Sequence, residues 1–275
     1  MADRNGTVHW IIQENQGDSD SVPRIVQALE SDRRVPHLVW LTKSLDVPPM
    51  PDLPDDGPIV CHGQGFVTRA LHHPRLKAGL FFDPEKFQWS AFRSGWKGAM
   101  LSSDGRIMSL SDARDFLGNG LTAFVRPDSD SKVFDGGVYD ASGLVAATPE
   151  IRVAPTTTVI LASPCTIEAE WRSFVVDREI VGCSEYRRWR RASIDGAVPR
   201  VAIDLAAELA ARWSPADAYC LDLAASGDRI GVVEANCFNA SRFYAAPCRA
   251  SSQSGQRLCA VPSVNDPDSQ ELNLN

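Results

Sequence analysis

The sequence predicts an α+β protein in which a small α/β block precedes a larger block rich in strands. Short apolar runs alternate with a helix-like segment at the start of the chain, the pattern of a parallel sheet with crossover helices. Beyond residue 120, β-branched and aromatic runs separated by turn residues dominate instead. We therefore expect an α/β domain at 1–117, a strand-rich domain at 118–247 and a polar C-terminal tail at 248–275.

The first block is predicted to contain three buried strands and a helix. Apolar runs at residues 8–12, 37–41 and 58–62 have the length of buried strands. Residues 21–32 carry apolar side chains at helical spacing, and a short capped helix is expected at residues 109–117. The glycines of CHGQGFV favour a tight strand-to-helix turn over an anion-binding loop, because the third glycine of a dinucleotide fingerprint is missing.

The second block is predicted to begin with a strand at residues 121–127 and to continue as strands interrupted by one helix. The strand-like runs are TTTVILAS, EWRSFVV, EIVGCSEY, AYCLDLA and RIGVVEANCF. The helix is expected at residues 198–213, with Pro199 in its first turn, where proline is tolerated. Its apolar face is predicted to comprise Val201, Leu205, Leu209 and Trp213.

Composition and charge limit the classes of function. The chain has 275 residues, of which 44% are hydrophobic and 23% charged, as in a folded protein with one or two cores. A formal net charge of −7 disfavours non-specific nucleic-acid binding, which needs a broad basic face. No apolar run is long enough to cross a membrane. Seven cysteines without a CxxC pair indicate reduced thiols, so we expect a soluble, cytoplasmic protein.

The most informative segment is YCLDLAASGDRIGVVEANCFN, which we expect to form an antiparallel hairpin with a turn at residues 226–228. This hairpin places Asp222 roughly opposite Glu234, with Asn236 on the same face. Two carboxylates among apolar neighbours need a positive partner, and this oxygen set suits magnesium. The alternative is an edge hairpin whose polar side chains face solvent.

A second hairpin, EAEWRSFVVDREIVGCSEYR, is expected to turn at residues 177–178. Alternation assigns one face of it to Glu168, Glu170, Arg172, Phe174 and Val176, with Cys183, Glu185 and Arg187 from the partner strand. An arginine on a strand face is a good bidentate donor to phosphate. The alternative is a solvated ladder of cross-strand ion pairs, and a one-residue change in register would break the arrangement.

Two further segments carry cationic side chains. In FVRPDSDSKVFDGG, Arg126 ends a strand and Lys132 follows in a polar loop closed by glycine. The two cations could clamp a polyphosphate, although a plain turn is the alternative. RRWRR, at residues 187–191, is a dense basic cluster that could contact an acidic protein or RNA, or be a solvated loop.

Taken in order, FVRPDSDSKVF, EWRSFVVDREIVGCSEYR, LDLA and VVEANCFN resemble the ATP-grasp superfamily, and within it the divergent clade named for two arginines and a lysine. That clade includes the eukaryotic cell-division-cycle protein that helps to assemble a translation initiation factor. The resemblance covers residues 121–244. It implies an ATP-grasp fold, in which two strand-rich α+β subdomains clasp ATP, preceded by a small α/β pre-ATP-grasp domain.

The resemblance also implies a nucleotide site. Arg126, where most ATP-grasp enzymes have a lysine, and Lys132 would bind the phosphates. The stretch Leu161, Ala162 and Ser163 would be the hinge that meets adenine. Glu170 would hold the ribose hydroxyls.

The metal and the chemistry are implied in the same way. Asp222, Glu234 and Asn236 would bind Mg²⁺, in agreement with the hairpin geometry. Arg172 would contact the phosphates. Arg172 and Arg187 are the candidate catalytic residues, and Arg187 would steady the transferred phosphoryl group or the acyl-phosphate.

The implied activity is an ATP- and magnesium-dependent ligation. A carboxylate on a peptide, a protein or a small metabolite would be activated as an acyl-phosphate and attacked by an amine. Glu185 is a candidate for taking the proton of the amine. The alternatives are an ATP-binding assembly factor that holds a protein partner without net ligation, and a phosphotransferase that stops after phosphorylating its acceptor. Neither a membrane nor a nucleic acid is an expected partner.

Overall fold

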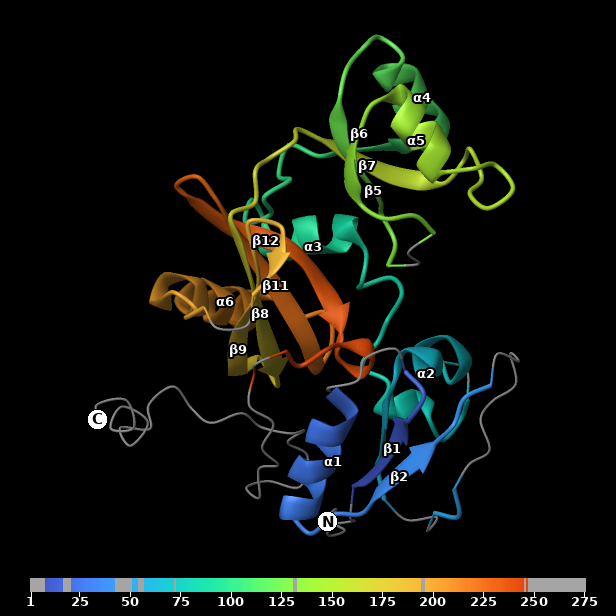
Figure 1. Cartoon of the computed structure of the whole chain (residues 1–275), viewed down its shortest axis with the longest axis vertical. Coiled ribbons are helices and arrows are strands. Elements are labelled where there is room, and N and C mark those ends of the chain that lie inside the picture. Colours follow the sequence, from blue (N-terminus) through green and yellow to red (C-terminus); the bar gives the residue numbers. More distant parts are fainter. Residues whose placement is uncertain are drawn as a thin grey trace.

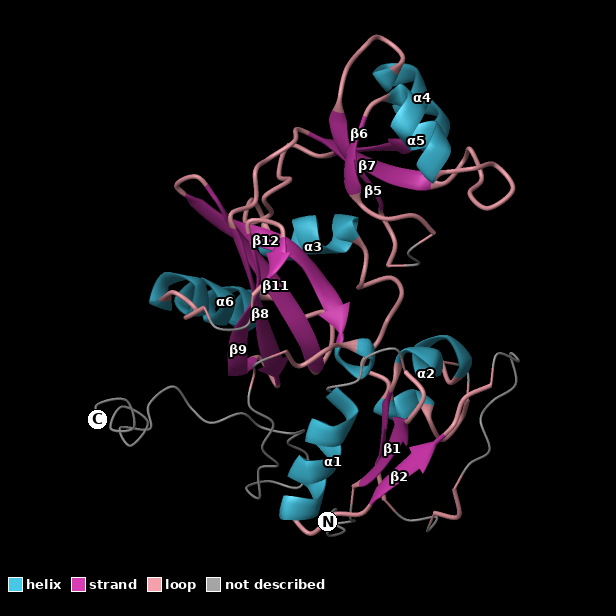
Figure 2. Ribbon diagram, in the orientation of Figure 1, coloured by secondary structure: helices cyan, strands magenta, loops and turns pink. Residues whose placement is uncertain are grey.

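The computed structural model describes residues 8–16, 21–42, 51–53, 57–71, 73–130, 133–193, 196–244 and 246, so the predicted tail at 248–275 lies outside the described residues. Three sheets follow one another along the long axis of the molecule (Figure 1). The chain begins in the three-stranded sheet, and the five-stranded sheet lies between that sheet and the four-stranded one (Figure 2).

The three-stranded sheet comprises β1 (His9–Gln13), β2 (Pro36–Val39) and β3 (Ile59–His62) in the order β2-β1-β3, and all pairs are parallel. Its helices are α1 (Ser21–Ser31) and α2 (Gln64–Arg69). The predicted parallel α/β block is therefore confirmed, with strand ends shifted by one or two residues. Gly63 forms the expected strand-to-helix turn at φ +143°, and a Cβ there would lie 2.3 Å from that of Gln13, so only glycine fits.

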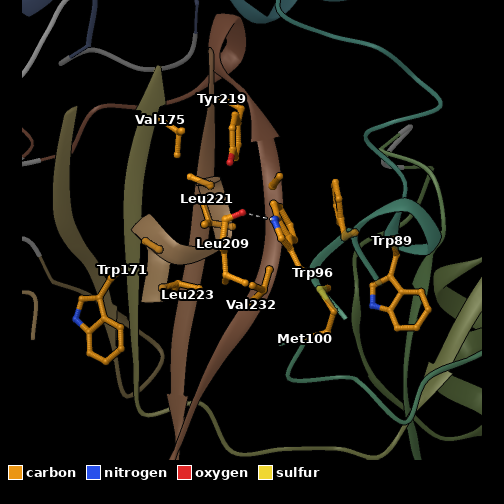
Figure 3. Close-up of a cluster of buried hydrophobic side chains, with 14 of the residues drawn as sticks. Trp89, Trp96, Met100, Trp171, Val175, Leu209, Tyr219, Leu221, Leu223 and Val232 are labelled. Carbon is orange, nitrogen blue, oxygen red and sulfur yellow. Dashed lines mark hydrogen bonds between the residues drawn. The ribbon is translucent and has the colours of Figure 1, made fainter. Parts of the chain in front are cut away.

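The five-stranded sheet is antiparallel, in the order β10-β9-β8-β11-β12. Its strands are β8 (Ala169–Val176), β9 (Glu179–Arg188), β10 (Arg191–Ala192), β11 (Ala218–Ser226) and β12 (Arg229–Cys237). One face packs on α3 (Trp89–Trp96) and α6 (Arg200–Arg212) around a cluster of large aromatic and aliphatic side chains (Figure 3). Within this cluster the indole N–H of Trp96 donates to the backbone carbonyl of Leu209 at 3.2 Å.

The buried face of α6 agrees with the prediction at Leu209, and Leu205 and Trp213 also pack against the cluster, but the prediction is wrong at Val201 and omitted the alanines. Ala202, Ala206, Leu209 and Ala210 face the sheet, whereas Val201 is 60% exposed. Alanines let the helix backbone approach the sheet closely, so small residues form part of the contact face beside the larger apolar ones. The helix also begins after Pro199, which is the N-cap residue.

The four-stranded sheet has the order β4-β7-β5-β6 and is antiparallel. Its elements are β4 (Arg106–Ser109), α4 (Leu110–Leu117), β5 (Ala123–Pro127), β6 (Gly137–Tyr139), α5 (Ala141–Ala147) and β7 (Thr158–Ala162). Helix α4 has the expected serine cap, in which Ser109 accepts from the backbone N–H of Asp112. The sheet and its core extend across the predicted boundary at residue 117, because β4 pairs with β7.

Two short 3₁₀ helices, η1 (Lys77–Gly79) and η2 (Phe238–Ala240), help to join the first sheet to the five-stranded one. In η2, the side chain of Asn239 donates to the backbone carbonyls of Cys61 and Gly79 and accepts from the backbone N–H of Phe81. Apolar side chains of β1, α1, β8 and β11 form one continuous cluster across the same junction. The two sheets therefore share a core.

No helix in the described part of the chain has the length and apolarity needed to span a membrane.

Candidate functional site

A cleft of about 650 Å³ separates the four-stranded sheet from the face of the five-stranded sheet that lies opposite α3 and α6. Charged side chains of both signs line it: Arg126, Arg172, Arg187 and Arg242, together with Asp130, Asp135, Glu170, Asp222 and Glu234. Gln64, at the start of α2, also reaches it. The predicted polar residues of three separate segments thus meet in one cleft.

The β11–β12 hairpin brings the predicted oxygen ligands together. Asp222 pairs directly with Glu234, as expected, and a β-bulge between Asp222 and Leu223 produces this pairing. The side-chain nitrogen of Asn236 lies 2.9 Å from Oδ2 of Asp222 and 3.0 Å from Oε1 of Glu234. Because β11 lies inside the sheet and Asp222 is 1% exposed, the alternative of a solvated edge hairpin does not describe this cluster.

Arg172 forms a bidentate pair with Asp222 from the neighbouring strand β8. Its Nε and Nη2 donate to Oδ1 and Oδ2 at 2.8 and 2.6 Å, and both side chains are buried. Burial raises the pKa of the Asp222 carboxyl, against the opposing attraction of Arg172. Burial alone would lower the pKa of Arg172, but its attraction to Asp222 raises that pKa well above its usual value. Arg172 is therefore the positive partner that the buried carboxylate requires.

Arg126 connects the two sheets across the cleft. It lies on β5 of the four-stranded sheet, and its Nη1 is 3.3 Å from Oε2 of Glu234 on β12 of the five-stranded sheet. The side chain of Arg126 is 12% exposed and that of Glu234 27%. This ion pair closes the cluster at the side that solvent reaches.

Glu170 holds a second group of polar side chains on the same face. It accepts from the hydroxyl of Tyr186 at 2.7 Å and from Nη1 of Arg187 at 2.8 Å. Burial, aided by the carboxylates of Asp222 and Glu170, raises the pKa of Tyr186 far above its usual range. The guanidinium of Arg172 lies 5.4 Å from the rings of both Tyr186 and Tyr244. Arg172 therefore connects the Asp222 cluster to the polar side chains around Glu170.

The predicted face of β9 is wrong at two positions. Cys183 and Glu185 pair with Ser173 and Trp171, which point away from the cleft. A β-bulge near Phe174 shifts the register by one residue, and a second bulge near Glu170 shifts it by one more residue in the same direction. The two shifts together return Arg187 to the face of Glu170, with which it pairs. The sequence contains no glycine or other signal at the second bulge, and the alternation rule alone could not find it.

The side chain of Glu185 consequently lies in a buried network of hydrogen bonds. It is fully buried and accepts from the indole of Trp171 (3.3 Å), from Nε of Arg188 (3.0 Å) and from the hydroxyl of Ser193 (2.6 Å). A Cβ at Gly196 would lie 2.2 Å from one of its oxygens, so a larger residue there would displace the carboxylate. It does not line the cleft, and the expectation that it takes a proton there is corrected.

Two parts of the expected nucleotide site remain predictions. Leu161 and Ala162 end β7 as buried residues, and the backbone N–H of Ser163 donates to Asp104 at 3.0 Å, but none of the three is among the residues that line the cleft. Lys132 lies outside the described residues.

The sequence-based reasoning missed the two stacked tyrosines. The rings of Tyr186 and Tyr244 lie 5.1 Å apart at an interplanar angle of 19°, and both line the cleft. Tyr186 reaches it only because of the second bulge in β9, and Tyr244 because the chain turns back after η2 at φ +48°. Neither feature has a sequence signal.

Among the described residues, no group of three or more histidine, cysteine, aspartate and glutamate side chains converges as a metal site. The cluster of Asp222, Glu234 and Asn236 has two carboxylates, hard oxygen ligands of the kind used by magnesium, which takes few protein ligands, and the amide of Asn236 turns its nitrogen towards both of them. The chemistry of this set fits Mg²⁺, with Arg126 and Arg172 neutralising the carboxylates.

The fold is also found in solved ATP-grasp proteins. A RimK domain protein of Sphaerobacter thermophilus shares 15% identity over 83% of this chain and 90% of its own, with a TM-score of 0.57. The D-cycloserine synthetase DcsG shares 14% identity over 85% of this chain and 92% of its own, with a TM-score of 0.52. The ATP-grasp ligase PsnB, complexed with a minimal precursor, shares 12% identity over 86% of this chain and 91% of its own, with a TM-score of 0.51. At these identities the likeness concerns the fold.

No curated protein matches the chain. A family profile matches residues 104–251, which is more than half of the 275 residues. It describes an ATP-grasp domain, family 2 of the clade named for two arginines and a lysine. The expected resemblance and the ATP-grasp fold are therefore confirmed. The chain belongs to the ATP-grasp superfamily, in family 2 of that clade.

Proposed function

We propose that this protein is an ATP- and Mg²⁺-dependent carboxylate–amine ligase that works through an acyl-phosphate. The observation that carries the proposal is the cleft itself, in which Arg126 of one sheet contacts the Asp222–Glu234–Asn236 cluster of the other. Membership of the ATP-grasp superfamily supports nucleotide binding at this place. A neighbour of the same fold, PsnB, has been solved with a phosphomimetic variant of its minimal precursor, Mg and ADP.

The cations of the cleft have distinct parts in the proposal. Arg126 and the half-exposed Arg187 can reach a phosphoryl group, because among the residues that the structure describes each pairs with one carboxylate and has donors left over. Arg172 donates to both oxygens of Asp222 and acts by holding that carboxylate in place. Bound Mg²⁺ would neutralise phosphate charge, and such electrostatic stabilisation contributes most to the catalysis of phosphoryl transfer.

The proposed reaction has two covalent steps. An oxygen of the acceptor carboxylate bonds to the γ-phosphorus of ATP as the bond to ADP breaks. A neutral amine then attacks the carbonyl carbon, and inorganic phosphate leaves as the amide forms. Since Glu185 faces away from the cleft, the amine proton passes to solvent in this scheme.

The first experiment is calorimetry of Mg-ATP binding to the wild type and to Glu234→Ala combined with Asn236→Ala. We expect binding that requires Mg²⁺ and is lost in the double variant. The matched control combines Asn119→Ala with Glu150→Ala, exposed residues of the four-stranded sheet's domain, and should bind as the wild type does. Absence of binding in the wild type would refute the nucleotide site, and binding unchanged in the double variant would refute its metal ligands.

The second candidate function is an ATP-binding assembly factor, which the same cleft and clade also suit. Hydroxylamine separates the two because it converts acyl-phosphates into stable hydroxamates. Candidate acceptors incubated with Mg-ATP and hydroxylamine should yield a hydroxamate and one phosphate per turnover if the protein is a ligase. ATP turnover that needs a protein partner and gives no hydroxamate would favour the assembly factor.

A further inference from the structure

The arginine-rich segment of the sequence forms an exposed hairpin at the edge of the five-stranded sheet. We call residues 187–192 the basic hairpin; it joins the end of β9 to β10, and every residue in it is exposed. Trp189 at its tip is 58% exposed. The backbone N–H of Trp189 donates to the carbonyl of Glu168, where the chain enters β8, at 2.7 Å.

Two features of the basic hairpin are locally unfavourable: the backbone conformation of its turn and a cross-strand pair of like charges. Trp189 and Arg190 form the turn with φ of +47° and +65°, a conformation that large side chains rarely adopt. Arg188 pairs directly with Arg191 across the strands, and like charges in this position repel. The turn at Asp177 and Arg178 has similar angles, but aspartate is enriched in that conformation.

Only half of the hairpin's positive charge is neutralised. Arg187 pairs with Glu170 and Arg188 with Glu185. Arg190 and Arg191 have no ion-pair partner among the residues that the structure describes. Two guanidinium groups without an ion-pair partner in the described part of the chain therefore directly follow an exposed indole, on a protein whose net charge is −7. Local conflicts of this kind concentrate at functional sites.

The basic hairpin is continuous with the cleft. Arg187 belongs to both, since it lines the cleft and pairs with Ala192 of β10. A chain that lies along the hairpin can therefore place a side chain in the cleft beside Glu170 and Arg187. On these grounds we propose that the basic hairpin is a docking surface for an acidic polypeptide segment, with carboxylates bound by Arg190 and Arg191 and an apolar side chain on Trp189.

This inference rests on the proposed function in one respect: the docked segment carries the acceptor carboxylate only if the protein is the proposed ligase. A peptide fits the surface better than RNA does. RNA binding needs a broad basic face, whereas in this hairpin two arginines are without an ion-pair partner among the described residues. A short acidic segment needs only the two arginines and the indole.

The test is fluorescence anisotropy with a labelled twelve-residue peptide that repeats Glu-Leu-Glu-Ser, measured without nucleotide. The variant is Arg190→Gln combined with Arg191→Gln. The matched control, Arg152→Gln combined with Arg178→Gln, removes the same charge from exposed arginines elsewhere. Since each exposed ion pair adds little, we expect the variant to bind about tenfold more weakly. The control should bind as the wild type does, and binding should weaken with added salt.

Three results would overturn the proposal: no peptide binding by the wild type, equal loss in variant and control, or tighter binding of a single-stranded RNA of equal charge. A peptide with glutamine in place of glutamate should not bind. Trp189→Gly, which relieves the turn, should also weaken binding while leaving the fold intact. Mg-ATP binding measured on the same proteins keeps the two ideas separate, because peptide binding without Mg-ATP binding would refute only the proposed function.

Discussion

Replacing Arg172 by methionine would isolate a buried charge at the centre of the cleft. The two hydrogen bonds to Asp222 disappear, and a carboxylate that is 1% exposed loses its positive partner. Removing one member of such a pair costs about 3–5 kcal/mol. With a urea m-value of about 2–3 kcal/mol/M, the unfolding midpoint at pH 7.5 should fall by more than about 1 M.

The same substitution has a pH dependence whose sign follows from Asp222. Burial already raises its pKa, and loss of Arg172 removes the opposing attraction, so the pKa rises further. The carboxyl of Asp222 in the folded variant then favours its protonated form. The loss of unfolding free energy that is due to the buried charge is absent below the unfolded pKa of about 4, and it grows as the pH rises towards the pKa of the folded variant. The stability deficit should therefore shrink towards about 1 kcal/mol near pH 4, which is the lost packing of the arginine stem.

Urea titrations of the wild type and the variant at pH 4 and pH 7.5 test this reasoning. Asp222→Asn added to the Arg172→Met background should restore part of the stability, because the neutral amide removes the unpaired charge. A deficit that is the same at both pH values, or a double variant whose losses simply add, would refute the view that an uncompensated carboxylate is the cause. Arg172→Lys should fall between the wild type and Arg172→Met, since it keeps the charge and loses the bidentate geometry.

Two other predictions concern residues outside the cleft. Burial tends to raise the pKa of Glu185, but hydrogen bonds from Arg188 and Ser193 outweigh it and lower the pKa. The substitution Glu185→Gln should therefore reduce the free energy of unfolding by about 1–3 kcal/mol at pH 7. This stabilisation is present above the unfolded pKa and is lost as the pH falls through the folded pKa. Urea titrations should therefore show that the difference in unfolding free energy between the wild type and the variant narrows in acid. Loss of Mg-ATP binding in this variant would contradict the structural role of Glu185. Burial raises the pKa of Cys220 to about 12, so at pH 8 iodoacetamide should modify exposed Cys165 first, as read by peptide mass spectrometry, and equal rates would refute the burial.

Much of the fold follows from local patterns in the sequence. The parallel sheet of the first block and the antiparallel hairpins of the second are confirmed, because alternating and continuous apolar runs match their burial. Helix α3 is not among the elements that the sequence analysis predicts. Its buried residues Trp89, Phe92 and Trp96 do have helical spacing, so the signal was present but short. Strand β4 was missed because Ile107 is exposed and the strand has no buried run.

The polar site could be predicted only as far as the register could. The β11–β12 turn leaves two residues, Gly227 and Asp228, between the paired Ser226 and Arg229. A regular ladder from this turn would place Asp222 opposite Val233 and send Glu234 to the other face.

The structure has a β-bulge beyond Leu223, which leaves Val233 without a partner and brings Glu234 opposite Asp222. On β9, the second bulge likewise brings Tyr186 and Arg187 together on Glu170. In both hairpins the bulge that turns a polar residue towards the cleft lies directly beside that residue. A bulge costs a hydrogen bond of the ladder, yet both hairpins have one directly next to the functional side chains. This indicates that the backbone here is determined by where those side chains must lie and not by the regularity of the sheet.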